Sequence, residues 1–297
     1  MQQLFNINSW LLLLYIYVAI VLISFIYGVA TKNVSQVDRL WSILPIFMAW
    51  IYAYISEWAD IVIVMACCIT FWGVRLTWNF FIKGGYRMEK GIFVEEDWRW
   101  GYLRTFITNP ILWQLFHFGF ICSIQLALVI GFTIPVLLVA LSDRSSGLYL
   151  SDFFFCFLFL FFFGMETIVD INMFRFQTEK HRLSSEEQKM SRDICISAGF
   201  DFSGLRKYSR HPNYFAEVMQ WVVIYMWGSY RIGNWLNWGL LFAIVLFVIV
   251  YCSTFVSEPV ASKKYPLYAE YQKATWRFIP FFPVHFEAFL EKAKSGK

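Results

Sequence analysis

The stretch from Tyr208 to Glu217 gathers more polar chemistry than any other part of this chain: Tyr-Ser-Arg-His-Pro-Asn-Tyr-Phe-Ala-Glu. Pro212 suits the first turn of a helix, because a proline has no N–H that would go unpaired there. Asn213 and Glu217 then fall four residues apart on one face of that helix, with Tyr214 beside them. An amide, a phenol and a carboxyl group on adjacent turns predict a ligand site where this helix begins.

Two donors precede that helix and favour an anionic ligand. The unpaired N–H groups and the positive dipole end of a helix start attract phosphate, and Arg210 and His211 add charge and donors. The alternative is an interfacial anchor, in which Tyr208 and Arg210 lie at the level of the lipid headgroups. The anchor does not account for Glu217, which lies more than one turn inside an apolar helix.

A second pair of polar residues, Glu166 and Asp170, is also spaced four residues apart, and Arg175 follows it. Two carboxylates on one helix face repel each other unless something donates hydrogen bonds to them. The hydroxyl groups of a ribose or an amide would do so, and so would neighbouring arginines in a purely structural ion network. Both interpretations of this pair stay open on the residues alone.

Three further segments carry polar groups that could serve a site. Asp38 lies just before an apolar stretch and so places a carboxyl group where that predicted span begins. The segment 96–104 alternates acids, arginines and tryptophans, as in a membrane-surface segment or a lid over a cofactor. The tail segment 265–283 ends in a Pro-bounded aromatic run, and it could re-enter the interface or form an amphipathic surface helix.

Several classes of site are excluded by what the sequence lacks. The four histidines are scattered, and the six cysteines form no C-x-x-C pair, so we expect no metal site and no disulfide framework. Neither G-x-G-x-x-G nor G-x-x-x-x-G-K-[ST] occurs, so any nucleotide must be held without a Rossmann or P-loop motif. A net charge of +4 is too small to indicate nucleic-acid binding.

The composition indicates a polytopic membrane protein that positions these groups on spanning helices. Of the 297 residues, 59% are apolar and 15% are charged, and the mean hydropathy is +0.52. A soluble domain carries about a quarter charged residues. We therefore expect an all-α fold, one integral membrane domain over 1–297 that forms a seven-transmembrane helix bundle with a tail over 258–297. The predicted spans, each near the length of about 20 residues that crosses a bilayer, are 10–30, 40–56, 61–82, 111–141, 148–168, 212–230 and 232–257.

Loop charges predict the orientation of these spans. With seven spans, the loops 31–39, 83–110 and 169–211 and the tail lie on one side, and they hold 22 of the 25 Lys and Arg residues. Cytoplasmic loops carry the excess of Lys and Arg. The predicted topology therefore has the N-terminus outside and the C-terminus in the cytoplasm. Dividing the long fourth stretch into two spans would spoil this partition.

Six ordered motifs of this chain resemble the steroid 5-alpha-reductase superfamily, in particular its large branch of unknown function. The resemblance covers nearly the whole chain, from about residue 35 to residue 283. The motifs are Val-Asp-Arg-Leu-Trp (37–41), Arg-Leu-Thr (75–77), Glu-Asp-Trp-Arg-Trp (96–100), Glu-x-x-x-Asp (166–170), Tyr-Ser-Arg-His-Pro-Asn-Tyr-x-x-Glu (208–217) and Tyr-x-x-x-Thr-x-x-Phe-Ile-Pro (271–280).

The resemblance implies a helix bundle that binds NADPH in a cytoplasm-facing cavity and reduces a lipid substrate that enters from the bilayer. It implies cofactor contacts to the nicotinamide from Asn213 and Glu217, and contacts near the nucleotide from Glu166 and Asp170. The residues it implies for the phosphates and the closing tail are Arg175, Tyr208, Arg210, His211 and Tyr271.

We therefore expect an NADPH-dependent oxidoreductase that reduces a carbon–carbon double bond of a steroid-like or isoprenoid lipid. Hydride transfer leaves a charge that an acid must neutralise. A carboxyl group in a low dielectric has a raised pKa and could keep its proton at pH 7, so Glu217 and Asp38 are candidate donors. Tyr214 could polarise a carbonyl group. The sequence departs from the steroid enzymes at Trp72, which stands where they have a catalytic tyrosine, so steroid itself is not the expected substrate.

Two alternatives share the same sequence features. The Arg-His-Pro entry and the glutamate one turn deeper also occur, loosely, in isoprenylcysteine-type methyltransferases, which use S-adenosylmethionine. A non-catalytic lipid-binding protein could keep the same fold. We expect a multi-pass protein of the endoplasmic reticulum if the source is eukaryotic, or of the inner membrane if it is bacterial.

Overall fold

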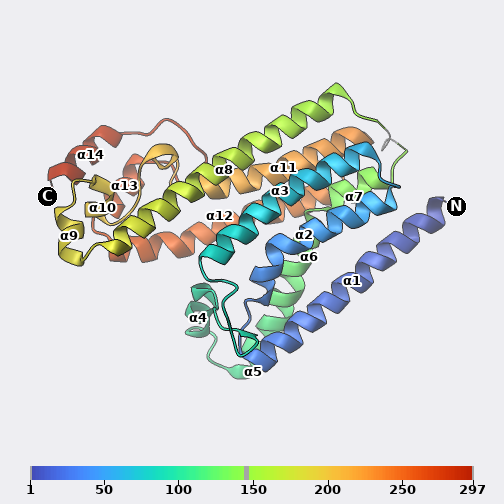
Figure 1. Cartoon of the computed structure of the whole chain (residues 1–297), viewed down its shortest axis with the longest axis horizontal. Helices are drawn as coiled ribbons and strands as arrows, with labels where there is room; N and C mark the ends of the chain where they lie inside the picture. Colours follow the sequence, from blue (N-terminus) through green and yellow to red (C-terminus); the bar gives the residue numbers. More distant parts are fainter. Residues whose placement is uncertain (1, 144–146, 296–297) are drawn as a thin grey trace. The chain divides into compact units, whose positions relative to one another are not determined.

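The computed structural model describes residues 2–143 and 147–295, and it is all-α apart from one short hairpin (Figure 1). Residues 144–146 of the predicted loop 142–147, and 296–297 of the predicted tail, lie outside the described residues. The N-terminal elements are α1 (Gln2–Thr31), α2 (Gln36–Ile55), α3 (Asp60–Ile82), β1 (Met88–Glu89), β2 (Ile92–Phe93), α4 (Trp98–Arg104), α5 (Pro110–Phe116), the π-helix η1 (His117–Ile124), α6 (Gln125–Gly131) and α7 (Ile134–Ala140). They are followed by α8 (Leu150–Arg182), α9 (Ser185–Met190), α10 (Ile194–Ala198), the 3-10 helix η2 (Gly204–Lys207), α11 (Pro212–Ile232), α12 (Trp238–Lys264), α13 (Tyr268–Ala274) and α14 (Phe286–Ser295).

Five helical segments of the described chain are long and apolar enough to cross a membrane, which identifies an integral membrane protein. They are Trp10–Thr31, Asp60–Ile82, Pro110–Gly131, Leu150–Arg182 and Trp238–Lys264. Many of their large apolar side chains are exposed, as expected where lipid is the solvent. The predicted spans 40–56 (apart from Ser56) and 212–230 are helical too, within α2 and α11, but they are not among these five segments.

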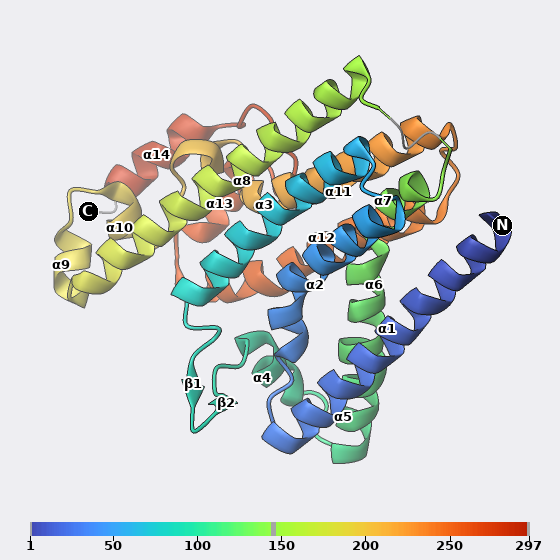
Figure 2. The ribbon, with the colours of Figure 1, turned by 45° about the vertical axis from the view of Figure 1, so that its right-hand side comes forward.

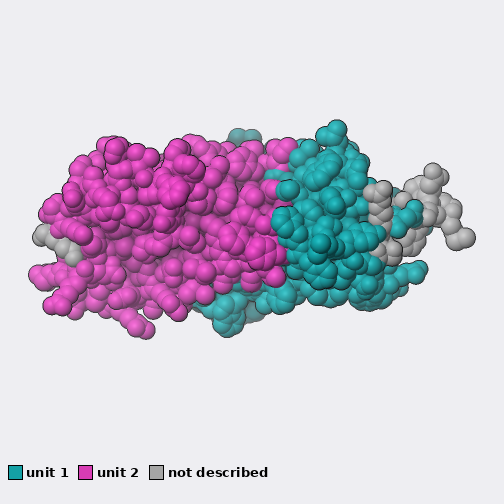
Figure 3. Space-filling model, turned by 90° about the horizontal axis from the view of Figure 1, so that it is seen from above, with its two compact units in different colours: residues 1–156, 224–243 teal, residues 157–223, 244–297 magenta. Residues whose placement is uncertain are grey.

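The chain divides into two compact units, coloured separately in Figure 3. Unit 1 comprises residues 1–156 and 224–243, and unit 2 comprises residues 157–223 and 244–297. Helices α8, α11 and α12 each contribute residues to both units.

Unit 1 is built around the packing of α2 against α3. The two backbones approach closely at Gly73, where an added Cβ would lie 2.5 Å from the carbonyl oxygen of Ser42. Small residues permit such close approach between membrane helices. Helix α1 packs on η1 and α6, and Gly28 leaves room for the buried ring of His117.

The predicted fourth span, 111–141, is interrupted after Gly131. Pro135 has no N–H to donate to the Gly131 carbonyl, so the helix cannot continue. The Thr133 hydroxyl instead donates to the carbonyl of Ile130 at 2.7 Å, and it pairs with the Tyr52 hydroxyl at 3.1 Å. The short helix α7 begins after this turn.

The segment between α3 and α5 is pinned to the start of α2 within unit 1. It holds the β1–β2 hairpin and α4 (Figure 2). Arg39 donates to the carbonyls of Gly85 and Glu95, and Asn33 donates to the carbonyl of Glu95 at 3.0 Å. The Ser35 hydroxyl accepts from the backbone N–H of Asp97 at 2.9 Å. These bonds tie the segment to the residues around the start of α2.

In unit 2, the C-terminal tail (258–297) forms an aromatic cluster with the segment that follows α8. Its buried members include Phe200, Phe202, Tyr271 and Phe289. The amphipathic helix α14 turns Phe286 and Phe289 into this cluster and its charged face outward. The tail is therefore folded against unit 2.

We expect Gly73→Ala to destabilise the protein, because the new methyl group would collide with the Ser42 carbonyl and the Ile46 side chain. Overpacking of this kind costs about 1–3 kcal/mol. The measurement is the apparent melting temperature of the detergent-solubilised protein. Gly164→Ala is the matched control, because nothing lies within 4 Å of a Cβ added there. Equal melting temperatures for the two variants would contradict the close approach of α2 and α3.

Candidate functional site

Polar side chains of α8 and α11 face each other in unit 2. The Asn213 amide donates to Asp170 at 3.4 Å, and about two turns further along α11 the Gln220 amide donates to Glu166 at 2.7 Å. Glu166 and Gln220 are buried. The structure therefore brings three of the predicted residues into one row of carboxylate–amide contacts, which we call the α8–α11 ladder. Gln220, which the sequence analysis missed, completes it.

The two predicted residues of α11 that could act on a substrate lie beside this ladder. Glu217 is half-buried, one turn beyond Asn213, and it takes part in interactions of its own. Tyr214 is also half-buried and stacks on His211, with ring centroids 5.4 Å apart and planes 16° from parallel. Arg175, on α8 beyond the ladder, is exposed.

Glu258, a buried carboxylate near the end of α12, binds side chains of the residues just before α11 and of the tail. Arg210 donates to it through Nε at 2.7 Å and Nη2 at 3.2 Å, and His211 Nε2 lies 3.1 Å away. Gln272 donates at 2.9 Å, and Arg277 forms an ion pair at 3.3 Å. Glu258 is only 2% exposed, so a carboxylate taken out of water is balanced by two guanidinium groups.

Arg210 thereby ties α11 to the tail. Its remaining donor nitrogen bonds the backbone carbonyls of Gln272, at 2.8 Å, and Thr275. The guanidinium is buried, and its nitrogens donate to Glu258 and to the tail. In this arrangement Arg210 positions the tail, and a phosphate would have to displace one of these contacts.

His211, Tyr208 and Tyr271 also have defined places in this region. Burial lowers the pKa of His211, while the bond to Glu258 opposes that shift. Tyr208 is exposed, and its carbonyl accepts from the N–H of Phe281 at 3.2 Å. Tyr271 lies inside the aromatic cluster, where its hydroxyl donates to the carbonyl of Arg206 at 2.6 Å. Tyr271 is therefore a core residue of the folded tail, and burial raises its pKa.

Asp38, the other predicted proton donor, belongs to unit 1. The Trp100 indole donates to it at 2.7 Å, and Arg99 forms an ion pair at 3.6 Å. Burial raises the pKa of Asp38, and Arg99 and Trp100 partly oppose this shift. A carboxyl group with a raised pKa is suited to hold a proton.

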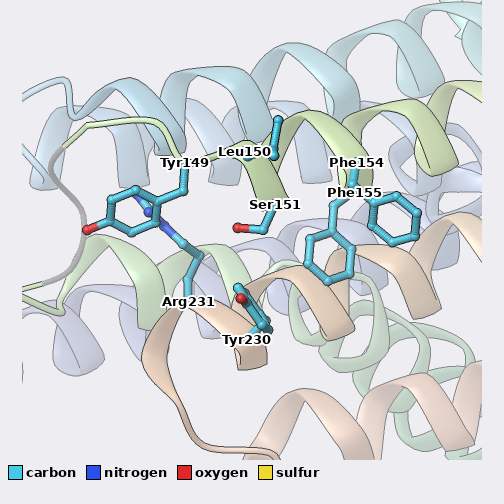
Figure 4. Close-up of a pocket in the computed structure, with 7 residues that line it drawn as sticks. All are labelled: Tyr149, Leu150, Ser151, Phe154, Phe155, Tyr230 and Arg231. Atoms are coloured by element: carbon cyan, nitrogen blue, oxygen red, sulfur yellow. The ribbon is translucent and has the colours of Figure 1, made fainter.

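Unit 1 also contains a cavity of about 900 Å³ at the start of α8 and the end of α11 (Figure 4). Among the described residues that line it, the one cation is Arg231, which is paired with the buried carboxylate of Asp152 at 3.5 Å; Trp227 also donates to Asp152 at 2.7 Å. All the predicted cofactor residues belong to unit 2, so none of them lines this cavity. Its lining is Tyr149, Leu150, Ser151, Phe154, Phe155, Tyr230 and Arg231.

Two side chains that the sequence analysis did not assign to the site, Glu258 and Arg277, are central to its structure. Glu258 lies 48 residues after Arg210 in the chain, and no local spacing links the two. The one available signal was a glutamate at the end of a long apolar stretch, where an unpaired charge would be costly. Within the described residues, no three His, Cys, Asp or Glu side chains come together as metal ligands would.

A model of a family of proteins of unknown function, DUF1295, matches residues 24–275, which is most of the chain. The chain belongs to the DUF1295 family. It is also 31% identical over 274 residues to an uncharacterised protein of Schizosaccharomyces pombe, covering 87% of this chain and 78% of that one. No solved structure matches this DUF1295 chain.

We expect Glu258→Gln to destabilise this DUF1295 protein by about 3–5 kcal/mol, because the buried guanidinium of Arg210 and the half-buried one of Arg277 would lose their counter-charge. The tail should then loosen, so the melting temperature should fall and limited proteolysis should cut between residues 265 and 285. Glu270→Gln is the control, since Glu270 pairs with Lys273 and Lys292 on the surface and should leave both readouts unchanged. Wild-type protease resistance in Glu258→Gln would show that the tail is held by other contacts.

Proposed function

We propose that this protein is an NADPH-dependent membrane oxidoreductase that reduces a carbon–carbon double bond in a steroid-like or isoprenoid lipid. We place it in a branch of the steroid 5-alpha-reductase superfamily. The observation that carries the proposal is the α8–α11 ladder, in which Asp170 meets Asn213 and Glu166 meets Gln220. Paired carboxylates and amides supply the acceptors and donors that ribose hydroxyls and a carboxamide require.

The ladder fits the uncharged parts of such a cofactor. Asn213 would hold the carboxamide, and Asp170 and Glu166 would accept from ribose hydroxyl groups. Arg175, exposed beyond the ladder, is the cation best placed for a phosphate. When bound, NADPH supplies the hydride for the reduction.

The chain itself must supply the proton. Glu217 and Tyr214, which lie next to Asn213 on α11, are the candidates within unit 2, and Asp38, whose pKa burial raises, is the candidate within unit 1. Trp72, buried in α3, stands where the steroid enzymes have a tyrosine, and an indole N–H is not acidic enough to replace that phenol. This difference favours a substrate other than the steroids of those enzymes.

We further propose that α2 and α11 cross the membrane as well, which gives seven spans. The N-terminus would then lie outside and the C-terminus in the cytoplasm, where NADPH is available. The excess of Lys and Arg on one set of loops supports this orientation. The membrane would be the endoplasmic reticulum in a eukaryote or the inner membrane in a bacterium.

A second candidate is an S-adenosylmethionine-dependent methyltransferase of the isoprenylcysteine type. One observation favours it: Arg210 and His211 both bond Glu258, so fewer cations remain for phosphate than the sequence suggests. S-adenosylmethionine carries no phosphate and needs fewer cations than NADPH, which has three phosphate groups. The same ladder could hold its ribose.

Ligand-induced thermal stabilisation separates these candidates. We expect NADPH at about 100 times its Kd to stabilise the purified protein by about 2.7 kcal/mol, since a ligand of the folded state shifts unfolding by mass action. S-adenosylmethionine should have no effect. Stabilisation by S-adenosylmethionine alone would instead support the methyltransferase, and stabilisation by neither would support a non-catalytic lipid-binding protein.

We expect Asn213→Ala to weaken NADPH binding roughly tenfold, because one hydrogen bond to the cofactor is lost. The measurement is titration of NADPH against melting temperature. Asn8→Ala, at an exposed amide of α1, is the control and should bind as the wild type does. Unchanged NADPH binding by Asn213→Ala would remove the ladder from the proposed site.

A further inference from the structure

The tail segment 276–284 combines a buried side with an unusually apolar exposed side. It has no helix or strand, and it contains two prolines, Pro280 and Pro283. Phe278 is buried, whereas the large side chains around it are exposed. The exposed residues are Trp276, Ile279, Phe281, Phe282 and Val284, with exposed fractions of 49%, 61%, 61%, 78% and 48%.

The position of Phe278 fixes how deep this segment lies along α12. Its ring contacts Phe247 and Tyr251 of α12, each with centroids 5.6 Å away, and Phe215 of α11 at 5.9 Å. Phe247 lies ten residues before Ser257, the last residue of the predicted span. At about 1.5 Å per residue that is about 15 Å of helix, half the thickness of a hydrocarbon core of about 30 Å.

Several backbone groups of the segment are hydrogen-bonded to the residues just before α11. The N–H groups of Arg210 and His211 donate to the carbonyls of Trp276 and Arg277, at 2.8 and 3.2 Å. The Ser209 hydroxyl donates to the carbonyl of Phe278 at 2.7 Å. The two prolines carry no N–H that would need a partner. Such bonds to the protein lower the cost of placing irregular backbone near the hydrocarbon core.

The one full charge in the segment is neutralised. Arg277 forms an ion pair with Glu258 at 3.3 Å, and its guanidinium lies 4.0 Å from the centre of the Phe255 ring. An arginine in hydrocarbon is costly unless it is paired in this way. The exposed face of the segment is therefore aromatic and aliphatic, without a free charge.

We propose that residues 276–284 form a re-entrant segment that inserts into the bilayer beside α12, with Trp276, Ile279, Phe281 and Phe282 in contact with lipid. The bilayer is the partner of this face, because the segment lies against the middle of a helix that is itself apolar enough to span it. The chain would thus return into the membrane after its last span. This inference does not depend on the proposed activity.

Site-directed spin labelling of the full chain in lipid nanodiscs tests the insertion. The six cysteines are replaced, and a nitroxide is attached at Phe282→Cys, at Val248→Cys or at Lys273→Cys. Val248 is an exposed residue of α12 and reports lipid, whereas Lys273 is an exposed residue of α13 and reports water. Accessibility to apolar oxygen and to a water-soluble nickel complex is measured at each position.

We expect the oxygen-to-nickel accessibility ratio at position 282 to match that at 248 and to exceed that at 273 severalfold. A ratio at 282 equal to that at 273 would overturn the proposal and leave the segment in water. Spin–spin broadening at 282 that disappears when labelled protein is diluted with unlabelled protein would also overturn it, since a second copy would then cover this face. A nitroxide at Ile279→Cys gives an independent reading if the Phe282 variant is not monodisperse.

Discussion

The structure of unit 2 depends on one buried negative charge. Two arginines, a histidine and a glutamine lie within hydrogen-bond or ion-pair distance of Glu258. Arg210 and His211 come from just before α11, and Gln272 and Arg277 come from the tail. A carboxylate at the end of a membrane-spanning helix is tolerated only when its charge is compensated. The contacts that compensate this charge hold the tail against the residues just before α11 and the last turns of α12.

The same rule applies to the other polar groups among the apolar helices. Asp152 is balanced by Arg231 and Trp227 in unit 1, and Glu166 by Gln220 in unit 2. Glu258, Asp152 and Glu166 are each buried, and each accepts from at least one partner. Asp152 and Glu258 are each ion-paired with an arginine, and Glu166 and Asp170 each accept from a side-chain amide.

Much of the fold could be predicted because it follows from short-range properties of the chain. Apolar length predicted the five helical segments that can span a membrane, and the spacing of Asn213 and Glu217 after Pro212 placed them on one helix start. The interruption at Gly131 was visible as a glycine and a proline, but the loop charges favoured an unbroken stretch. Pro135 cannot donate an N–H to the carbonyl of Gly131, so α6 ended at Gly131. The loop charges carry no information about this break.

The candidate site could be predicted only in part. The pair Asn213 and Glu217 and the pair Glu166 and Asp170 were recognisable, because local spacing puts each pair on one helix face. The functions of Arg210 and Tyr271 could not be assigned in the same way, because their partners are distant in the chain: Glu258 for one, the aromatic cluster for the other.

By itself, therefore, the sequence determined that this is an all-α membrane protein and which helix ends carry polar groups. Periodicity, apolar length and loop charge are properties of neighbouring residues, so they can be read from the sequence without knowing the fold. Only the tertiary structure decided which of those polar groups balance one another and which lie at the surface. The cost of burying a charge depends on groups that the folded chain brings together from far apart in the sequence.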